Sequence, residues 1–133
     1  MVCKRVREDA RTRGIKILSN THTLTHEKIN RMTEKQRTLK ESIVFNGVGL
    51  HTGKEVKMTF KPAPINNGYT FVRVDLEGSP IIEADANYVV NTQRGTNLEK
   101  LGVKIQTSEH VLAAFVGCDV DNVIIELNES EPP

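Results

Sequence analysis

The sequence lacks tryptophan, and aromatic residues make up only 5% of its 133 residues. Proteins that bind single-stranded nucleic acid stack the bases on aromatic side chains, so this shortage argues against a base-stacking surface. The longest apolar run, Val111 to Val116, is far shorter than the roughly 20 apolar residues that a membrane-spanning helix needs. Seven of the ten residues from Lys4 to Arg13 are charged, so we expect no secretory signal near the start of the sequence.

Cysteine is also scarce. The two cysteines are Cys3, in a charged stretch, and Cys118, in an apolar one. Two such residues do not make a disulfide framework, and the simplest interpretation is a reducing, cytoplasmic setting.

The charge of the chain is unevenly distributed. The formal net charge is +1, but residues 1–31 carry 8 Lys and Arg against 3 Asp and Glu, whereas residues 32–133 carry 10 against 14. The first part has few apolar residues and no sustained period, so it cannot offset its chain entropy by burial. We therefore expect residues 1–33 to be a basic, disordered leader and residues 34–133 to be the folded domain. Met32 is a possible alternative start of translation.

From residue 36 onward the pattern is that of short strands separated by Gly, Pro and Asn. Residues 55–60 alternate between charged or polar and apolar side chains, which is typical of a half-buried strand. Further strands are expected over residues 39–45, 69–76 and 123–127, and a hairpin over 92–106 that turns at 99–102. A helix is expected over 108–116, with Thr107 as its N-cap and Gly117 as its stop. This order predicts an α+β fold, a layered and mostly antiparallel sheet with the helix packed on one face.

Glu109 and His110 fall at the start of the predicted helix. The helix dipole and the unpaired N–H groups there favour a carboxylate and a neutral imidazole. A neutral imidazole on a metal beside a carboxylate base is the equipment of metal-assisted hydrolysis. Alternatively, Glu109 only stabilises the helix and His110 lies at the surface. One histidine is also not a complete zinc site, since catalytic zinc usually has three protein ligands.

The segment from Gly47 to Gly53 contains three glycines, but its spacing is not that of a dinucleotide-binding loop. It is either a plain turn or a loop that brings His51 close to a ligand. Four acids elsewhere are expected to be solvated side chains: Asp75, Glu77, Glu129 and Glu131. The pair His22 and His26 has helical metal-site spacing, but it lies in a threonine-rich stretch and we regard it as chance.

Taken together, six strings resemble a known family. In order, they are Gln36-Arg-Thr-Leu-Lys40, Gly47-Val-Gly-Leu-His-Thr-Gly53, Pro62-Ala-Pro64, Thr107-Ser-Glu-His110, Asn122-Val-Ile-Ile-Glu-Leu127 and Glu131-Pro132. They are similar to the first domain of the zinc-dependent UDP-3-O-acyl-N-acetylglucosamine deacetylases of lipid A biosynthesis. The resemblance covers about residues 35–133.

The resemblance implies a hydrolase of two similar α+β domains with the active site between them. His110 would be a zinc ligand and Glu109 the catalytic general base. The enzyme would remove acetate from UDP-3-O-acyl-N-acetylglucosamine in the cytoplasm of a Gram-negative bacterium. The residues that would bind the substrate are His51, Thr92, Gln93, Arg94 and Gly95.

The resemblance also implies that residues 34–133 stop before a second, C-terminal domain that would supply the remaining zinc ligands. We therefore expect this chain alone to bind zinc weakly and to be inactive. Two alternatives stay open. The chain could be a non-catalytic remnant that acts as an interaction domain. It could also bind nucleic acid through its basic leader, although the acidic remainder would repel phosphate.

Overall fold

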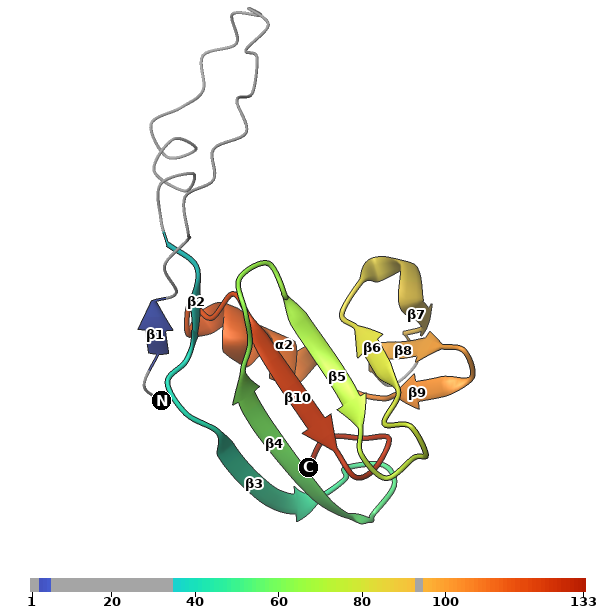
Figure 1. Ribbon diagram of the computed structural model, residues 1–133. Coiled ribbons are helices and arrows are strands. Elements are labelled where there is room, and N and C mark those ends of the chain that lie inside the picture. Colours follow the sequence, from blue (N-terminus) through green and yellow to red (C-terminus); the bar gives the residue numbers. More distant parts are fainter. Residues whose placement is uncertain (1–2, 6–34, 93–94) are drawn as a thin grey trace, which may run out of the picture.

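The computed structural model describes residues 3–5, 35–92 and 95–133 (Figure 1). Short strands dominate this part of the chain, and they are joined by tight turns. The strands are β1 (Cys3–Arg5), β2 (Arg37–Leu39), β3 (Ile43–Val48), β4 (Glu55–Pro62), β5 (Tyr69–Arg73), β6 (Ile81–Glu83), β7 (Val89–Asn91), β8 (Asn97–Lys100), β9 (Val103–Ile105) and β10 (Val123–Leu127). The helices are the 3₁₀ helix η1 (Ala86–Tyr88) and the α-helix α2 (Glu109–Gly117).

A five-stranded sheet with the order β3-β4-β10-β5-β6 forms the centre of the fold. The last strand, β10, lies in the middle, antiparallel to β4 and parallel to β5. The outer pairs, β3 with β4 and β5 with β6, are antiparallel. The sheet is therefore mostly antiparallel, as predicted, with one parallel pair at its centre.

Helix α2 packs against one face of this sheet (Figure 1). Its buried residues are Val111 and Phe115. The Phe115 ring centroid lies 4.7 Å from that of Phe60 on β4 and 5.8 Å from that of Tyr69 on β5. The predicted alternation in β4 is confirmed, since its buried residues are Val56, Met58 and Phe60. The α+β prediction, with the helix on one face, is thus confirmed.

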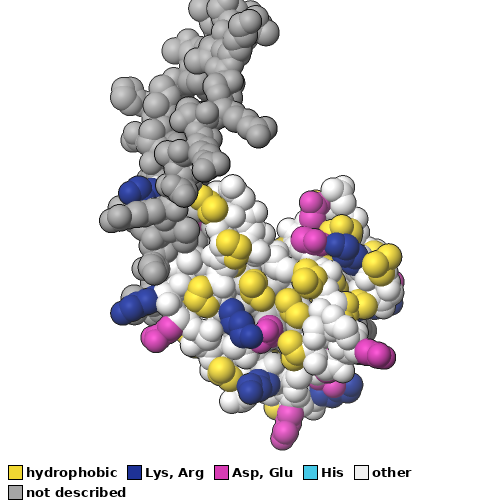
Figure 2. Space-filling view, in the orientation of Figure 1, with side chains coloured by type: hydrophobic (Ala, Val, Ile, Leu, Met, Phe, Trp, Pro, Cys, Tyr) yellow, Lys and Arg dark blue, Asp and Glu magenta, His cyan; other side chains and the backbone are white. Residues whose placement is uncertain are grey.

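The opposite face of the sheet has a mixed surface. Figure 2 shows hydrophobic, basic and acidic side chains interspersed over this face. Lys61 Nζ lies 2.6 Å from Glu126 Oε1 across the neighbouring strands β4 and β10. This face therefore carries no extended field of one sign.

A smaller, three-stranded sheet with the order β7-β8-β9 lies beside the main one. The hairpin expected over 92–106 is present as β8 and β9, and it turns at Leu101 and Gly102, both with positive φ. Glu99 and Lys100, expected in the turn, belong to β8 instead. Leu98 and Ile105 of this hairpin are buried and join the main core. The small sheet is thus anchored to the domain rather than standing apart from it.

Several element predictions differ from the structure. The strand expected over 69–76 is β5, which ends at Arg73, and β10 lies between it and β4. The run 39–45 is divided between β2 and β3. The place of β10 between β4 and β5 does not follow from local pattern, because β10 comes much later in the chain.

Three residues of the predicted leader form β1 and pair antiparallel with β2. The remainder of the predicted leader, together with His22 and His26, lies outside the described residues. The division of the chain at residues 33 and 34 stays a prediction. Among the described residues, neither helix has the length and apolar character needed to cross a membrane.

Candidate functional site

The start of helix α2 is joined to the residue that precedes β8. Ser108 is fully buried, and both its backbone N–H and its hydroxyl donate to the carbonyl of Thr96, at 3.1 and 2.9 Å. The N–H of Thr96 in turn donates to Glu109 Oε2 at 2.6 Å. Both the backbone N–H and the backbone carbonyl of Thr96 are therefore hydrogen-bonded to the start of α2. These bonds hold the start of the helix against the small sheet.

The predicted N-cap is wrong. The cap position is Ser108, which has helical backbone angles and makes no side-chain capping bond. Thr107 has φ of +51°, and its hydroxyl donates to Glu131 Oε1 at 3.1 Å. The Thr107 hydroxyl, predicted to cap the helix, is used instead for a contact with the segment after β10. The helix accordingly begins at Glu109.

Glu109 and His110 are adjacent and partly open to solvent. Their side chains are 36% and 80% exposed, and Glu109 Oε1 lies 3.8 Å from His110 Nε2. Burial by itself would raise the pKa of Glu109. The hydrogen bond from Thr96 and the proximity of His110 and His51 outweigh that effect and leave the pKa below its ordinary value. Glu109 is therefore a carboxylate at neutral pH, with Oε1 on the side of His110.

His51 lies on the glycine-containing loop between β3 and β4. The loop is closed by hydrogen bonds from Gly49 N to Lys54 O and from Gly53 N to Gly49 O, both 2.9 Å. Gly53 has φ of +65°, which a residue without Cβ adopts at no steric cost. His51 is exposed, and its proximity is one of the causes that hold the pKa of Glu109 below its ordinary value. The fold thus brings His51 into the neighbourhood of Glu109 and His110.

The expectation that Glu131 is solvated is wrong. Its side chain is fully buried, and its carboxylate accepts hydrogen bonds from the N–H groups of His51 and Thr52 and from the Thr107 hydroxyl. Asp75 is exposed, as expected, and forms an ion pair with Arg73, while Glu129 is half-buried and forms an ion pair with Lys54. The sequence gives no local signal for the partners of Glu129 and Glu131, because these partners lie at least 24 residues away along the chain.

The expected substrate-binding stretch is only partly described. Thr92 is exposed just after β7, and Gln93 and Arg94 lie outside the described residues. Gly95 has φ of +146°, and a Cβ placed there would come within 3.1 Å of Glu109 Oε1. Gly95 therefore belongs to the immediate surroundings of Glu109, and a larger residue would press on that carboxylate.

The described residues contain no group of three or more His, Cys, Asp or Glu side chains arranged to hold a metal ion. What they offer at the start of α2 is one exposed imidazole and one ionised carboxylate. This donor set suits zinc in kind, since histidine nitrogen and carboxylate oxygen are both zinc ligands. It falls short of the three protein ligands that catalytic zinc usually has.

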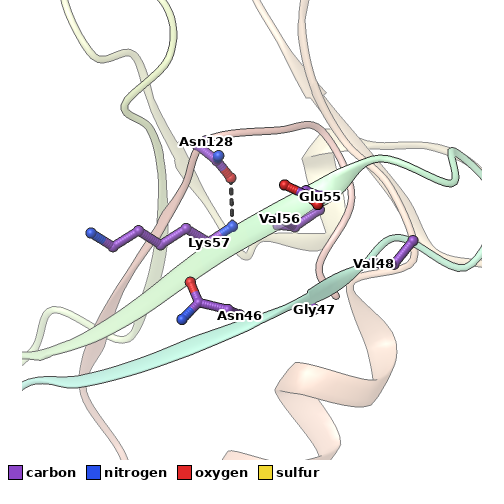
Figure 3. Close-up of a pocket in the computed structure, with 7 residues that line it drawn as sticks. All are labelled: Asn46, Gly47, Val48, Glu55, Val56, Lys57 and Asn128. Carbon is purple, nitrogen blue, oxygen red and sulfur yellow. Dashed lines mark hydrogen bonds between the residues drawn. The ribbon is translucent and has the colours of Figure 1, made fainter.

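A separate depression of about 490 Å³ lies along β3 and β4. Figure 3 shows Asn128, from the segment after β10, beside Lys57, whose N–H donates to Asn128 Oδ1 at 2.7 Å. The residues that line the depression are Asn46, Gly47, Val48, Glu55, Val56, Lys57 and Asn128. None of the residues around the start of α2 lines it, so it is distinct from the candidate site.

The sequence from residue 36 to the last residue is similar to known proteins. Residues 36–133 match the family model described as UDP-3-O-acyl N-acetylglycosamine deacetylase. Similar proteins include the bifunctional enzyme LpxC/FabZ of Chlorobaculum tepidum, 52% identical over 74% of this chain and 21% of the relative. The UDP-3-O-acyl-N-acetylglucosamine deacetylase of Chromohalobacter salexigens is 48% identical over 74% of this chain and 33% of its own length. The deacetylase of Xanthomonas oryzae pv. oryzae is 52% identical over the same shares.

The matched part of the chain spans between about a fifth and a third of the length of these relatives. The match contains β2 through β10 and α2, and with them Glu109, His110 and the His51 loop. The chain therefore belongs to the UDP-3-O-acyl N-acetylglycosamine deacetylase family.

Proposed function

We propose that residues 34–133 are the first domain of a zinc-dependent deacetylase that removes acetate from UDP-3-O-acyl-N-acetylglucosamine in lipid A biosynthesis. The observation that carries the proposal is the pairing of Glu109 and His110 at the start of α2, with the His51 loop joined to the preceding Thr107 through Glu131. The printed names of the relatives, which include UDP-3-O-acyl-N-acetylglucosamine deacetylase, support the choice of substrate.

Glu109 is the proposed general base. Its lowered pKa keeps it ionised at neutral pH, so it can accept a proton from an attacking water. The bond from Thr96 occupies Oε2 and fixes the orientation of the carboxylate, while Oε1 stays on the exposed side near His110. A fixed orientation matters because proton transfer requires the base to lie within hydrogen-bond reach of the water.

His110 is the proposed zinc ligand, since its side chain is 80% exposed and follows the base directly in the chain. When bound, zinc would act as a Lewis acid and lower the pKa of a water. The remaining ligands would come from a second domain. Helix α2 is suited to be covered by one, because its outer side carries apolar residues such as Val116, which is 63% exposed.

The proposed substrate contacts surround this pair. His51 is exposed on its loop and would face the sugar nucleotide, and Gly95 leaves room beside Glu109. Thr92, Gln93 and Arg94 would complete the contacts from the small sheet. The setting we propose is the cytoplasm of a Gram-negative bacterium, with no nucleic acid as partner.

The test is an acetate-release assay. The purified 133-residue chain is expected to show no turnover. A fusion of residues 34–133 to the second domain of the Chromohalobacter salexigens deacetylase is expected to be active, and a chelator should abolish the activity. In that fusion, Glu109→Gln should lower kcat by about 10²-fold or more. Glu99→Gln on β8 is the matched control and should leave kcat within twofold. A folded but inactive fusion would favour the non-catalytic remnant instead.

A further inference from the structure

A buried carboxylate links the two segments that carry the candidate site. Glu131 lies in the segment after β10 and is fully buried. Two backbone contacts lead this segment inward: Asn128 pairs with Lys57 of β4, and Ser130 O accepts from Gln106 N at 2.7 Å. The Glu131 side chain thereby enters the space between the His51 loop and the turn that precedes α2.

The carboxylate uses both oxygens. Oε2 accepts from the N–H groups of His51 and Thr52 at 3.0 and 2.9 Å, and Oε1 accepts from His51 N and the Thr107 hydroxyl, both at 3.1 Å. None of the ion pairs in the described part of the chain includes Glu131. Its charge is therefore held by N–H and O–H dipoles, an arrangement that requires closely fixed donors.

The donors come from distant parts of the chain. His51 and Glu131 are 80 residues apart, and Thr107 precedes Glu131 by 24. Thr107 immediately precedes the buried Ser108, which in turn leads into Glu109. Gly49 leaves the space that the carboxylate fills, because a Cβ there would come within 2.9 Å of Glu131 Oε2. One side chain thus sets the separation between the His51 loop and the start of α2.

We propose that Glu131 is a positioning residue that holds the His51 loop against the first turn of helix α2 through main-chain N–H groups and the Thr107 hydroxyl. The relevance of this contact to deacetylation rests on the proposed function, but the contact itself does not. Replacing the carboxylate leaves the N–H groups of His51 and Thr52 without their acceptor. Amide hydrogen exchange should then accelerate at His51 and Thr52 before it accelerates in the central sheet.

The direct test is an NMR measurement on the isotope-labelled 133-residue chain. Scalar couplings across hydrogen bonds should connect the amide nitrogens of His51 and Thr52 with the Glu131 side-chain carboxyl carbon. These couplings need no variant and no enzymatic activity, so their result is independent of the deacetylase proposal. A chain that is folded by its amide spectrum and shows neither coupling would overturn the positioning role.

Variants separate local positioning from general stability. In Glu131→Ala, amide hydrogen exchange at His51 and Thr52 should accelerate at least tenfold, with less than twofold change at Ile125 in the central strand. Glu131→Gln keeps one acceptor oxygen and should restore slow exchange at one of the two amides. Glu129→Gln is the matched control, since Glu129 lies nearby but pairs with Lys54; it should change neither amide. Equal acceleration at all three amides, or none at His51 and Thr52, would refute the proposal. If Glu131→Ala does not fold, the exchange rates in Glu131→Gln and the scalar couplings in the unchanged chain test the proposal in its place.

Discussion

Phe115 is the main apolar link between helix α2 and the sheet. It is 1% exposed, its ring meets Phe60 edge-on at 4.7 Å, and it stacks on Tyr69 at 5.8 Å. Removing a buried phenylalanine side chain costs about 3–5 kcal/mol, because apolar contacts are lost and a cavity remains. Natural domains are stable by about 5–15 kcal/mol, so Phe115→Ala should remove a large part of the free energy of unfolding.

The prediction is checked by urea and thermal unfolding followed by far-UV circular dichroism. Phe115→Ala should lower Tm by at least about 12 °C, at about 4 °C or more per kcal/mol for a domain of this size. Phe115→Leu retains apolar volume and loses the ring pairs, which are worth about 0.5–1.5 kcal/mol each, so its effect should be intermediate. Val116→Ala, one residue on and 63% exposed, should stay within about 0.5 kcal/mol of the unchanged chain. If Phe115→Ala costs no more than Val116→Ala, α2 is not held by this side chain and the packing argument fails.

Two further predictions concern Glu131 and the loop around it. The pKa of Glu131 lies below its ordinary value, because hydrogen bonds from Thr52, His51 and Thr107 outweigh the opposing effect of burial. Its contribution to stability is therefore present above the unfolded-state pKa of about 4.3 and is lost as pH falls through the folded-state pKa. The urea midpoint should be measured from pH 6 downward over about three pH units, a range that includes that pKa. It should fall less steeply with pH in Glu131→Gln than in the unchanged chain. Equal slopes in the two proteins would contradict this prediction. Gly49→Ala should destabilise the chain by about 1–3 kcal/mol, since its Cβ would collide with Thr52 Oγ1 and come within 2.9 Å of Glu131 Oε2. Gly117→Ala has open space around it and should be neutral or slightly stabilising. Urea unfolding of both variants compares them, and equal effects would argue against the close contacts at Gly49.

The predictions that succeeded depend on neighbours in the sequence. The alternation over residues 55–60 identified Val56, Met58 and Phe60 as core residues, because side chains on a strand alternate between its two faces. The hairpin turn at Leu101 and Gly102 and the end of α2 at Gly117 also follow from local chemistry. Local periodicity is sufficient for these features, since each involves residues only a few positions apart.

The prediction for Thr107 failed because its chemistry is ambiguous. A threonine before a helix can accept a hydrogen bond from the helix N–H groups, and that is the usual expectation. The same hydroxyl can instead donate to a buried carboxylate, as it does to Glu131. The partner of this hydroxyl lies 24 residues later in the chain, and no residue near Thr107 in the sequence predicts it.

The sequence by itself determined the alternating core strand, the apolar helix and the adjacency of Glu109 and His110, because each is a property of residues close together in the chain. The tertiary structure alone decided that β10 separates β4 from β5, that Thr96 fixes Glu109, and that Glu131 is buried against the His51 loop. The physical reason is that a buried polar group must find its partners wherever the packed chain supplies them. Glu131 and His51 are 80 residues apart, so their contact exists only after the sheet has assembled.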